Sequence, residues 1–491
     1  MSRARSGIFS APYAPVTLAN LAVIALAAFD ALAVIAALPS IAEDLGDVAL
    51  LPWVVTSYLG SSAVAVIVAG PIIDAIGVRR TFQVMGTWFL LTSVAVALAP
   101  TLGWVLVARL AQGLGGGLMF AVAIAAVGIA FPHDLRPSAF AANEAVFAAM
   151  GVGSPAIAAI LLEFSSWRLI FWIKVPLTAL ALLAGWNALP DKRPDAGRMR
   201  IDYLGVALMA AMVFFLLFGL GQVGIDWALA VPALLGAVAA FVVYWLHAGR
   251  HDSPVLERRH LTRMPLRWIH LAAGLVLAAG VAVDNYVPLY LQVSRGRSAG
   301  FAAFSVLFIA VGWTGGSFIY ARLMRNWSEP SVVVFGAAWL VPAIGLTATL
   351  VWVDAPLGLV FCSMFGMGIG IGLASTAALT MIQRSADVEE LGRVNAAHQF
   401  LRVLAISIGV ALGGAVLLGI VDAQVGDVEV VRSVLESDGS DAVEVADATA
   451  AAVADGLVGV LVTSAVLGMG CLAAALGLKR TTARDAHGSG G

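Results

Sequence analysis

Ionisable side chains stand inside long apolar stretches of the sequence. They are Asp30, Arg109, Glu144, Lys174, Asp284, His398 and Arg402. A charge at the centre of a bilayer costs free energy unless it is paired or faces water, so each is a candidate functional residue. Arginine keeps its proton, and its positive charge lowers the pKa of a nearby carboxylate. The carboxylate then releases its proton when the arginine is close. Asp30 paired with Arg109 is therefore the expected proton relay, and a static ion pair that locks two helices is the alternative.

Four of the other candidates have more than one reading. Asp284 mirrors Asp30 in the second half of the chain and is a candidate for proton coupling; with Asn285 at the central cavity beside it, it could instead bind a cation or a polar group of a substrate. Glu144 is either a solvated residue near the start of its helix or a second protonation site. His398 and Arg402 are one turn apart and share a helix face. We expect Arg402 to pair with Glu144 or Asp284 across a central cavity, and His398 to be a packed hydrogen-bonding residue.

The composition is that of a polytopic membrane protein. Of 491 residues, 61% are hydrophobic and 12% are charged, and the mean hydropathy is +0.95. Soluble domains average about 25% charged residues. Cys362 and Cys471 lie in apolar segments, so neither a disulfide framework nor a metal site is expected. Arg3 and Arg5 precede the first apolar segment, which we expect to be a retained helix and not a cleaved signal peptide.

Fourteen segments are apolar and long enough to cross about 30 Å of hydrocarbon, which takes about 20 residues. Their ranges are 15–39, 50–73, 80–100, 103–130, 138–162, 168–189, 202–221, 227–246, 267–291, 301–322, 331–353, 357–382, 393–419 and 456–477. With both termini in the cytoplasm, 21 of the 28 cations fall on the cytoplasmic side, four fall outside and three lie within helices. This asymmetry sets the orientation by the positive-inside rule.

The spans divide into two groups of six with two between them. The expected domains are a bundle at 1–189, a linker with two extra helices at 190–266, a second bundle at 267–479 and a cytoplasmic tail at 480–491. The second bundle contains an acidic extracellular loop at 421–455, which is either a partly helical cap or a solvated linker. The fold class is therefore an all-α polytopic membrane protein with fourteen spans.

A short basic loop joins the second and third spans. Its pattern G-x3-D-x2-G-x-R-R is formed by Gly70, Asp74, Gly77, Arg79 and Arg80. Glycine permits the tight turn, the aspartate can bind free N–H groups or the arginines, and the arginines can meet helix C-terminal carbonyls. The spacing resembles the loop 2–3 motif of the major facilitator superfamily, a cytoplasmic gating loop.

Two further stretches resemble motifs of the same superfamily. FDALAVIAALP, which contains Asp30, is similar to a first-helix motif whose aspartate is linked to proton coupling. RLAQGLGGG places Arg109, Gln112 and Gly113 in the fourth-helix pattern R-x2-Q-G. The resemblance implies that Asp30 and Arg109 act in coupling and that Gln112 lies by the central cavity.

The fifth and sixth spans depart from the family patterns. GVGSPAIAA resembles the antiporter motif G-x3-G-P-x3-G-G through Gly151, Gly153 and Pro155, but Ser154 replaces the glycine before proline. Small residues still permit close packing. In WRLIFWIKVP, Lys174 occupies the position where the similar family pattern has asparagine. This lysine either snorkels outward or takes part in binding.

Taken over nearly the whole chain, the sequence resembles the fourteen-helix drug:proton antiporter branch of the superfamily. The resemblance implies a proton-coupled exporter of hydrophobic or amphipathic molecules, of the multidrug efflux type, that works by alternating access. Export of lipid-like or anionic amphiphiles is one alternative, and a non-transporting scaffold is another. We expect a monomer in the cell membrane whose partners are substrate, protons and lipid, without nucleic acid, catalytic residues or any cofactor besides the proton gradient. The sequence has no G-x4-G-K-[ST] loop for ATP.

Overall fold

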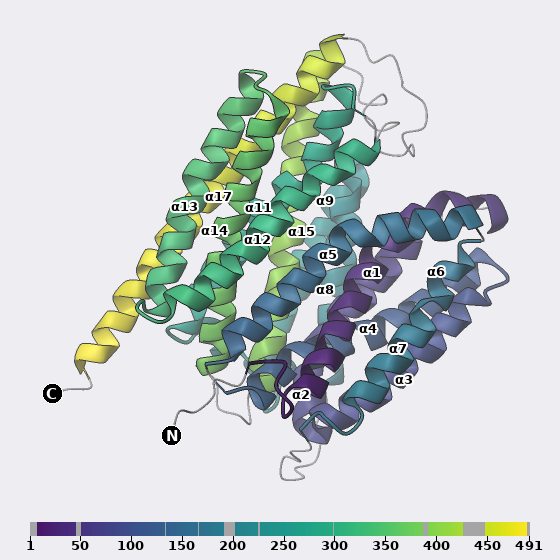
Figure 1. Cartoon of the computed structure of the whole chain (residues 1–491), viewed down its shortest axis with the longest axis vertical. Coiled ribbons are helices and arrows are strands. Elements are labelled where there is room, and N and C mark those ends of the chain that lie inside the picture. The colour runs from purple at the N-terminus through teal and green to yellow at the C-terminus, as the bar shows by residue number, and fades with distance from the viewer. Residues whose placement is uncertain are drawn as a thin grey trace. The chain divides into compact units, whose positions relative to one another are not determined.

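The computed structural model describes most of the chain. The described residues are 7–45, 51–132, 134–164, 166–190, 202–223, 226–297, 299–385, 391–425 and 447–488. All regular elements within these ranges are helices (Figure 1). Their bounds are α1 (Ala14–Leu45), α2 (Leu51–Ile76), α3 (Val78–Ala97), α4 (Leu102–Ala130), α5 (Arg136–Phe164), α6 (Arg168–Trp172), α7 (Lys174–Gly185), α8 (Tyr203–Gln222), α9 (Trp227–Ala248), α10 (Arg258–Thr262), α11 (Leu266–Val293), α12 (Ala299–Leu323), α13 (Glu329–Trp352), α14 (Leu357–Arg384), α15 (Leu391–Val425) and α17 (Asp447–Gly488).

The all-helical prediction is confirmed for the described residues. Eleven of the described helices are long and apolar enough to cross a membrane. The count of fourteen spans stays a prediction. Helix α1 continues past the expected end at residue 39, and α17 extends beyond both ends of the expected span 456–477. Of the acidic loop, residues 447–455 are helical, and residues 426–446 lie outside the described part.

The expected sixth span is two helices rather than one. Helix α6 ends at Trp172, and α7 begins at Lys174. Pro176 lies in the first turn of α7 and has no backbone N–H to donate to the carbonyl four residues earlier. A helix can accommodate proline in its first turn, where that N–H would be unpaired anyway. The break therefore places Lys174 at the very start of a helix.

The chain forms two compact units. Unit 1 comprises residues 1–217, 235–261 and 382–400, and unit 2 comprises residues 218–234, 262–381 and 401–491. The start of α15 thus groups with unit 1, although the sequence assigns it to the second bundle. The expected domain boundaries stay a prediction.

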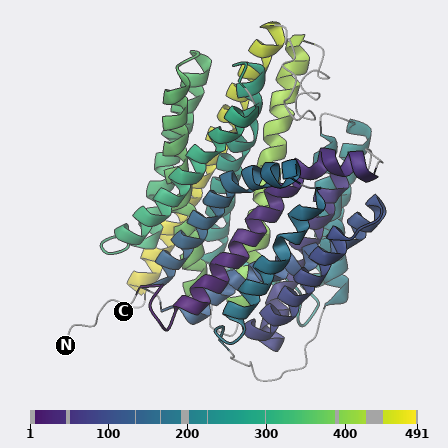
Figure 2. The same cartoon turned by 45° about the vertical axis from the view of Figure 1, so that its right-hand side comes forward.

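Unit 1 is built around α1 and α4. Helix α1 packs against α5 and α7, and α4 packs against α2 and α3, as Figures 1 and 2 both show. Gly113 and Gly117, one turn apart on α4, permit the close approach of α2. A Cβ at Gly113 would lie 2.4 Å from the Tyr58 carbonyl oxygen, and one at Gly117 would lie 2.3 Å from the Ser62 carbonyl oxygen. Small residues at this spacing are the usual means by which membrane helices pack closely.

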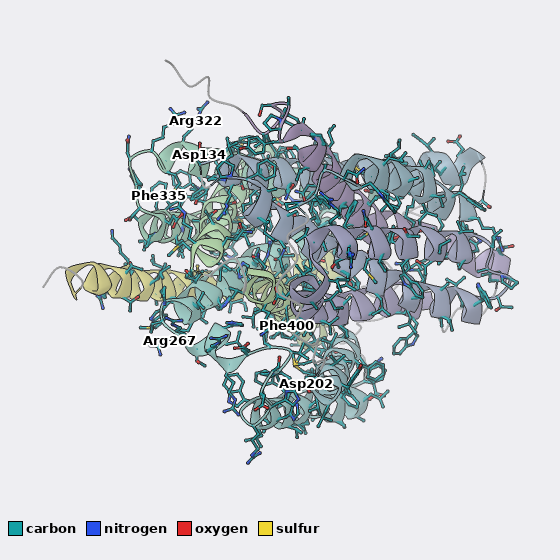
Figure 3. The ribbon with its side chains drawn as sticks, turned by 90° about the horizontal axis from the view of Figure 1, so that it is seen from below. Asp134, Asp202, Arg267, Arg322, Phe335 and Phe400 are labelled. Atoms are coloured by element: carbon teal, nitrogen blue, oxygen red, sulfur yellow. The ribbon has the colours of Figure 1, made fainter. Side chains whose placement is uncertain are left out.

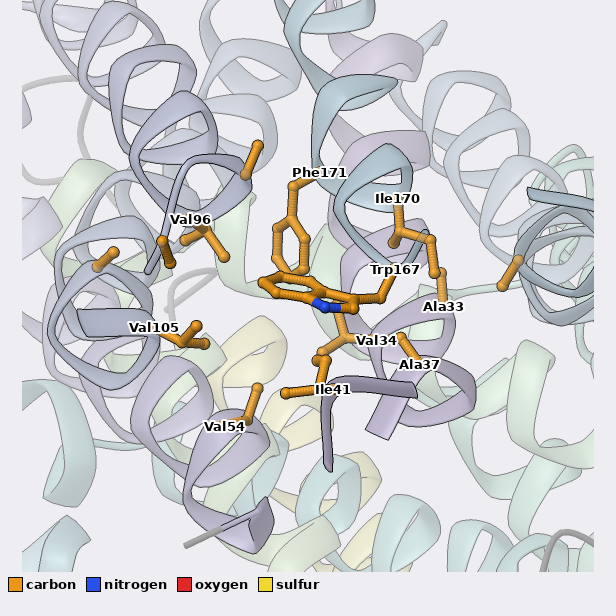
Figure 4. Packing of buried hydrophobic residues seen from close by; sticks show 14 of the residues in the cluster. Ala33, Val34, Ala37, Ile41, Val54, Val96, Val105, Trp167, Ile170 and Phe171 are labelled. Carbon is orange, nitrogen blue, oxygen red and sulfur yellow. The ribbon is translucent and has the colours of Figure 1, made fainter. Parts of the chain in front are cut away.

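An apolar cluster fills unit 1 beyond these helix contacts. Trp167 and Phe171 meet edge to face with ring centroids 5.9 Å apart, and Val34 and Ile41 from α1 surround the indole (Figure 4). Both rings are almost fully buried. This packing fixes α6 and the start of α7 against α1, which positions the polar groups described below.

Glycines also permit close helix packing in unit 2. Helix α17 packs along α11 and α13. Gly312 of α12 and Gly372 of α14 lie where a Cβ would come within 2.1 Å of the Phe365 carbonyl oxygen and 2.0 Å of the Trp313 carbonyl oxygen. Arg267 in the first turn of α11 and Arg322 near the end of α12 are visible in the view from below (Figure 3).

Candidate functional site

The buried centre of unit 1 contains the expected ion pair. Nη1 of Arg109 lies 3.0 Å from Oδ1 and 2.8 Å from Oδ2 of Asp30. The two side chains come from α4 and α1, and they are 1% and 0% exposed. The pairing that the sequence predicts is therefore present, and its role in proton coupling stays a prediction.

Lys174 is a third member of this ion pair. Its ammonium group, at the start of α7, forms an ion pair with Oδ1 of Asp30 and is 0% exposed. It also lies 4.0 Å from the centre of the Phe171 ring, a cation–π contact. The reading in which Lys174 snorkels outward is wrong, because the break before α7 and the burial of Phe171 direct the lysine inward. Asp30, Arg109 and Lys174 are called the charge triad below.

Polar groups from α2, α3 and α4 surround the arginine. Arg109 donates to Oε1 of Gln112 at 2.7 Å and to the Val54 carbonyl oxygen at 3.1 Å. Gln112 in turn donates to Oγ of Ser93 at 2.7 Å. The Tyr58 ring lies 4.2 Å from the guanidinium carbon. Five helices thus contribute to one network, in which the predicted Gln112 orients Arg109.

The charge triad carries an excess of positive charge. With every member ionised, one carboxylate faces two cations, so the formal charge is +1. Burying unpaired charge is costly, and an arginine cannot relieve the cost by losing its proton, whereas a lysine can. Two cations of different chemistry therefore share one buried carboxylate.

The basic loop forms a turn between α2 and α3. Gly77 precedes α3 with φ of 83°, a backbone conformation that favours glycine. Arg79 donates from Nε to the Leu189 carbonyl oxygen at 2.7 Å and from Nη2 to the Asn187 carbonyl oxygen at 3.0 Å. These carbonyls follow the end of α7 at Gly185, so the predicted contact between a loop arginine and helix C-terminal carbonyls stays a prediction. Arg80 is exposed.

Asp74 has a partner that the sequence does not predict. Its Oδ2 lies 2.9 Å from Nε of Arg393, at the start of α15, in an ion pair without hydrogen-bond geometry. Arg393 also donates from Nη1 to Oε1 of Glu257 at 2.9 Å. A Cβ at Gly70 would lie 2.6 Å from the Cα of Arg393, so glycine is required for this approach. Asp74, Arg393 and Glu257 are called the arginine clamp below.

Glu257 is ionised in the clamp. Burial favours its neutral form, but hydrogen bonds from Arg259 and Arg393 and the charge of His260 together lower the pKa of Glu257 below its usual 4.5. A carboxylate with a lowered pKa keeps its charge throughout the physiological range. The clamp therefore joins one cation to two anions at neutral pH.

Further candidates lie on α11 and α15. Asp284 is half-buried on α11, and its buried Oδ1 accepts no hydrogen bond from any described residue. Asn285 is exposed and donates to the Val281 carbonyl oxygen of its own helix at 2.8 Å. His398 is buried and Arg402 is half-buried on α15. The predicted pairing of Arg402 with Asp284 or Glu144 stays a prediction.

The α5 candidates are described in part. Glu144, Gly151 and Pro155 are on α5, but their side chains lie outside the described part. Gly153 has nothing within 4 Å of where a Cβ would stand. Their roles in protonation and close packing stay predictions.

Sequence reasoning did not predict Lys174 as a partner of Asp30, or Arg393 and Glu257 as members of the arginine clamp. Lys174 lies 144 residues from Asp30 in the chain. Its signal is a lysine in an apolar helix where the family pattern has a neutral amide. Arg393 lies in the first turn of α15, where the helix dipole disfavours a cation. That position signals an acidic partner, although it does not identify Asp74 or Glu257.

Comparisons with known proteins agree with this architecture. The family model of the Major Facilitator Superfamily matches residues 21–200 and 203–410. The tetracenomycin C resistance and export protein of Streptomyces glaucescens is 28% identical over 439 residues, covering 86% of this chain and 78% of that protein. The chain spans 58% of the length of an uncharacterized MFS-type transporter of Mycobacterium tuberculosis, with 29% identity over 404 residues that cover 80% of this chain. Further relatives at 25% to 29% identity have names that describe multidrug transport or resistance.

A solved structure supports the fold. The human organic anion transporter MFSD10 superposes with a TM-score of 0.61 over 92% of this chain and 98% of that one, at 14% sequence identity. At this identity the similarity bears on the fold alone. Because the family model matches well over half of the sequence, the chain belongs to the major facilitator superfamily, a family of transporters and not of enzymes.

Proposed function

We propose that the protein is a proton-coupled secondary exporter of hydrophobic or amphipathic small molecules, in the fourteen-span antiporter branch of its superfamily. The observation that carries the proposal is the fully buried charge triad. A buried carboxylate between two cations costs free energy that a purely structural contact does not require, since apolar side chains would serve as well or better. Such residues in membrane proteins mark proton and substrate pathways.

The partners of Asp30 support the proposed proton coupling. While its carboxylate is ionised, Asp30 holds α1 to α4 through Arg109 and to α7 through Lys174. Protonation removes the charge that both cations require, so the three helices lose a shared constraint. A proton that binds when the site opens to the outside and leaves when it opens to the cytoplasm would link helix movement to the proton gradient.

The arginine clamp is proposed to act as the cytoplasmic gate. It fixes the start of α15 to the end of α2 and to the segment after α9. Its members stay ionised at neutral pH, so the clamp opens by mechanical separation rather than by titration. This arrangement would couple the conformation of the cytoplasmic ends to events at the charge triad.

The names of the relatives support a cargo of amphipathic compounds, since they describe export of tetracenomycin C and multidrug transport. Anionic or lipid-like amphiphiles are the second candidate. The excess cation of the charge triad favours that class if the triad meets the substrate. We further propose a monomer in the cell membrane; the charge asymmetry of the sequence supports both termini in the cytoplasm.

Everted membrane vesicles test the proposal. Respiration acidifies their lumen, and a substrate of a proton antiporter then releases lumenal protons, which dequenches acridine orange. We expect dequenching with wild type for some cationic amphiphiles and its loss in Asp30→Asn. The control is Asp354→Asn, because Asp354 has φ of 53°, a conformation that asparagine also tolerates, and its side chain is 79% exposed. Equal responses in vesicles with and without the protein would contradict the proposal and favour a non-transporting scaffold.

A further inference from the structure

A second polar cluster lies at one end of the α8–α9 pair and takes no part in the charge triad. Asp202 immediately precedes α8, and His247 lies in the last turn of α9. His251 follows one turn later, so the two histidines have the spacing H-x3-H. Figure 3 labels Asp202 at the start of α8. The cluster therefore joins the residue before α8 to the end of α9 and the residues just after it.

The three side chains come close enough to share a ligand. One potential ligand atom of each lies within 4.8 Å of those of the other two. Nε2 of His247 is 2.7 Å from Oδ1 of Asp202, and the two imidazole ring centres are 5.1 Å apart. The backbone N–H of Ser253 donates to Nδ1 of His251 at 3.2 Å. This bond orients the second ring with its proton on Nε2, so binding a metal at Nε2 moves that proton to Nδ1 and breaks the bond from Ser253.

Only one of the two carboxylate oxygens of Asp202 accepts hydrogen bonds from the described part of the chain. Its side chain is 1% exposed. Oδ1 accepts from the Gly205 N–H at 2.7 Å as the N-cap of α8, but the buried Oδ2 accepts no hydrogen bond from any described residue. A buried carboxylate oxygen without a hydrogen-bond partner is destabilising, because it has lost its hydration. A cation bound beside His247 and His251 would remove this cost.

We propose that Asp202, His247 and His251 form a binding site for a divalent transition-metal ion of the Zn²⁺ class. Two imidazoles and one carboxylate are a common zinc ligand set, in which water supplies the fourth ligand. Ligands about 2.0–2.1 Å from a tetrahedral zinc ion are about 3.3 Å apart, so Nε2 of His247 and Oδ1 of Asp202 must separate slightly from their present hydrogen bond. Metal would replace the shared proton between them.

A metal ion here would join the two helix ends of the inserted pair. Near the opposite end, the helices already pack closely, because a Cβ at Gly219 of α8 would lie 2.9 Å from the Leu234 side chain. The metal would fix the end where the chain enters α8 and leaves α9. The site is independent of proton coupling and of the cargo, so it stands or falls separately from the proposed function.

Metal binding is measured on the purified full-length protein carrying an affinity tag without histidine. Co²⁺ is added to metal-free protein and its visible d–d absorption is followed, and bound Zn²⁺ is counted by elemental analysis after dialysis. We expect one ion per chain and an intense, tetrahedral-type Co²⁺ spectrum. We also expect His251→Gln to weaken binding at least about tenfold, since loss of even an outer partner costs that much.

Comparison of three variants separates metal binding from the simple ion pair between Asp202 and His247. His251→Gln leaves the Asp202–His247 contact in place, so it removes a ligand without removing the pair. Asp202→Asn keeps an N-cap residue for α8 but removes the charge, and it too should weaken Co²⁺ binding. His487→Gln, which removes a histidine outside the cluster, is the control and should bind like wild type. Absence of stoichiometric metal in wild type, or unchanged binding in His251→Gln, would overturn the proposal.

Discussion

At the scale of single residues, Asp30 has two cationic partners of different chemistry. Arg109 is permanently charged and held by Gln112 and the Val54 carbonyl, whereas Lys174 has an aromatic ring and the carboxylate as neighbours. Arginine thus supplies a fixed field, and lysine supplies a charge that the protein can gain or lose. This division favours Asp30 and Lys174 as the titrating members of the charge triad.

The charge balance of the triad predicts unequal effects of substitution. Asp30→Asn leaves two buried cations without a counter-ion and should lower the free energy of unfolding by about 3–5 kcal/mol. Lys174→Met keeps the Asp30–Arg109 pair and should cost much less. The double variant should be more stable than the sum of the single effects predicts, by about 1–3 kcal/mol. Thermal unfolding in detergent measures all three, and strict additivity would show that Lys174 and Asp30 do not interact.

Glu257 predicts a pH-dependent contribution to stability. Its folded pKa is below its unfolded value, so its contribution is present above about pH 4.3 and is lost as pH falls through the lower folded pKa. Because the partners Arg259 and Arg393 are 52% and 29% exposed, solvent screens both ion pairs, and Glu257→Gln should cost about 1 kcal/mol or less at pH 7. The difference in melting temperature should be constant between pH 6 and 8 and shrink towards pH 4.

The exposed Glu163 of α5 provides the matched control for this series. Glu163→Gln should change the melting temperature little at any pH. A Glu257→Gln effect that grew with acidity would contradict an ionised Glu257 that binds Arg393.

At the scale of helices, glycines decide which pairs approach closely. Gly113→Ala places a methyl group 2.4 Å from the Tyr58 carbonyl oxygen and should destabilise the α2–α4 contact by about 1–3 kcal/mol. Gly103→Ala, on the same helix with nothing within 4 Å, should be neutral or slightly stabilising. The two melting temperatures measured in detergent test this, and equal values would show that α2 and α4 have room to separate.

Gly70 permits a similarly close approach at the arginine clamp, between α2 and the start of α15. The Gly70→Ala methyl group would meet the Cα of Arg393 at 2.6 Å, so the start of α15 must move away from α2. We expect faster solvent exchange of the first-turn amides of α15, measured by hydrogen–deuterium exchange. Gly345→Ala on α13, which has open space, is the control and should leave this exchange unchanged.

At the scale of the whole molecule, the length and apolarity of the segments predict the helices, and the resemblance of the loop 2–3 and fourth-helix motifs predicts the superfamily. The helices are predictable because the bilayer requires each spanning helix to be about 20 residues long and apolar. The motifs also predicted that Asp30 and Arg109 meet. They could not predict Lys174, because its position depends on the helix break before α7 and on aromatic packing across α1. Nor could they predict the clamp, because its three members lie in separate segments whose meeting depends on tertiary packing.

The central claim is that Asp30 carries the coupling proton. The most direct test uses the purified protein in proteoliposomes with an imposed pH gradient and a lumenal pH dye, while cationic, anionic and lipid-like amphiphiles are added in turn. We predict that at least one cationic amphiphile drives proton movement through wild type and Asp354→Asn, and that Asp30→Asn still binds this compound but moves no protons. Substrate flux without proton movement in wild type, or unchanged proton movement in Asp30→Asn, would contradict the account.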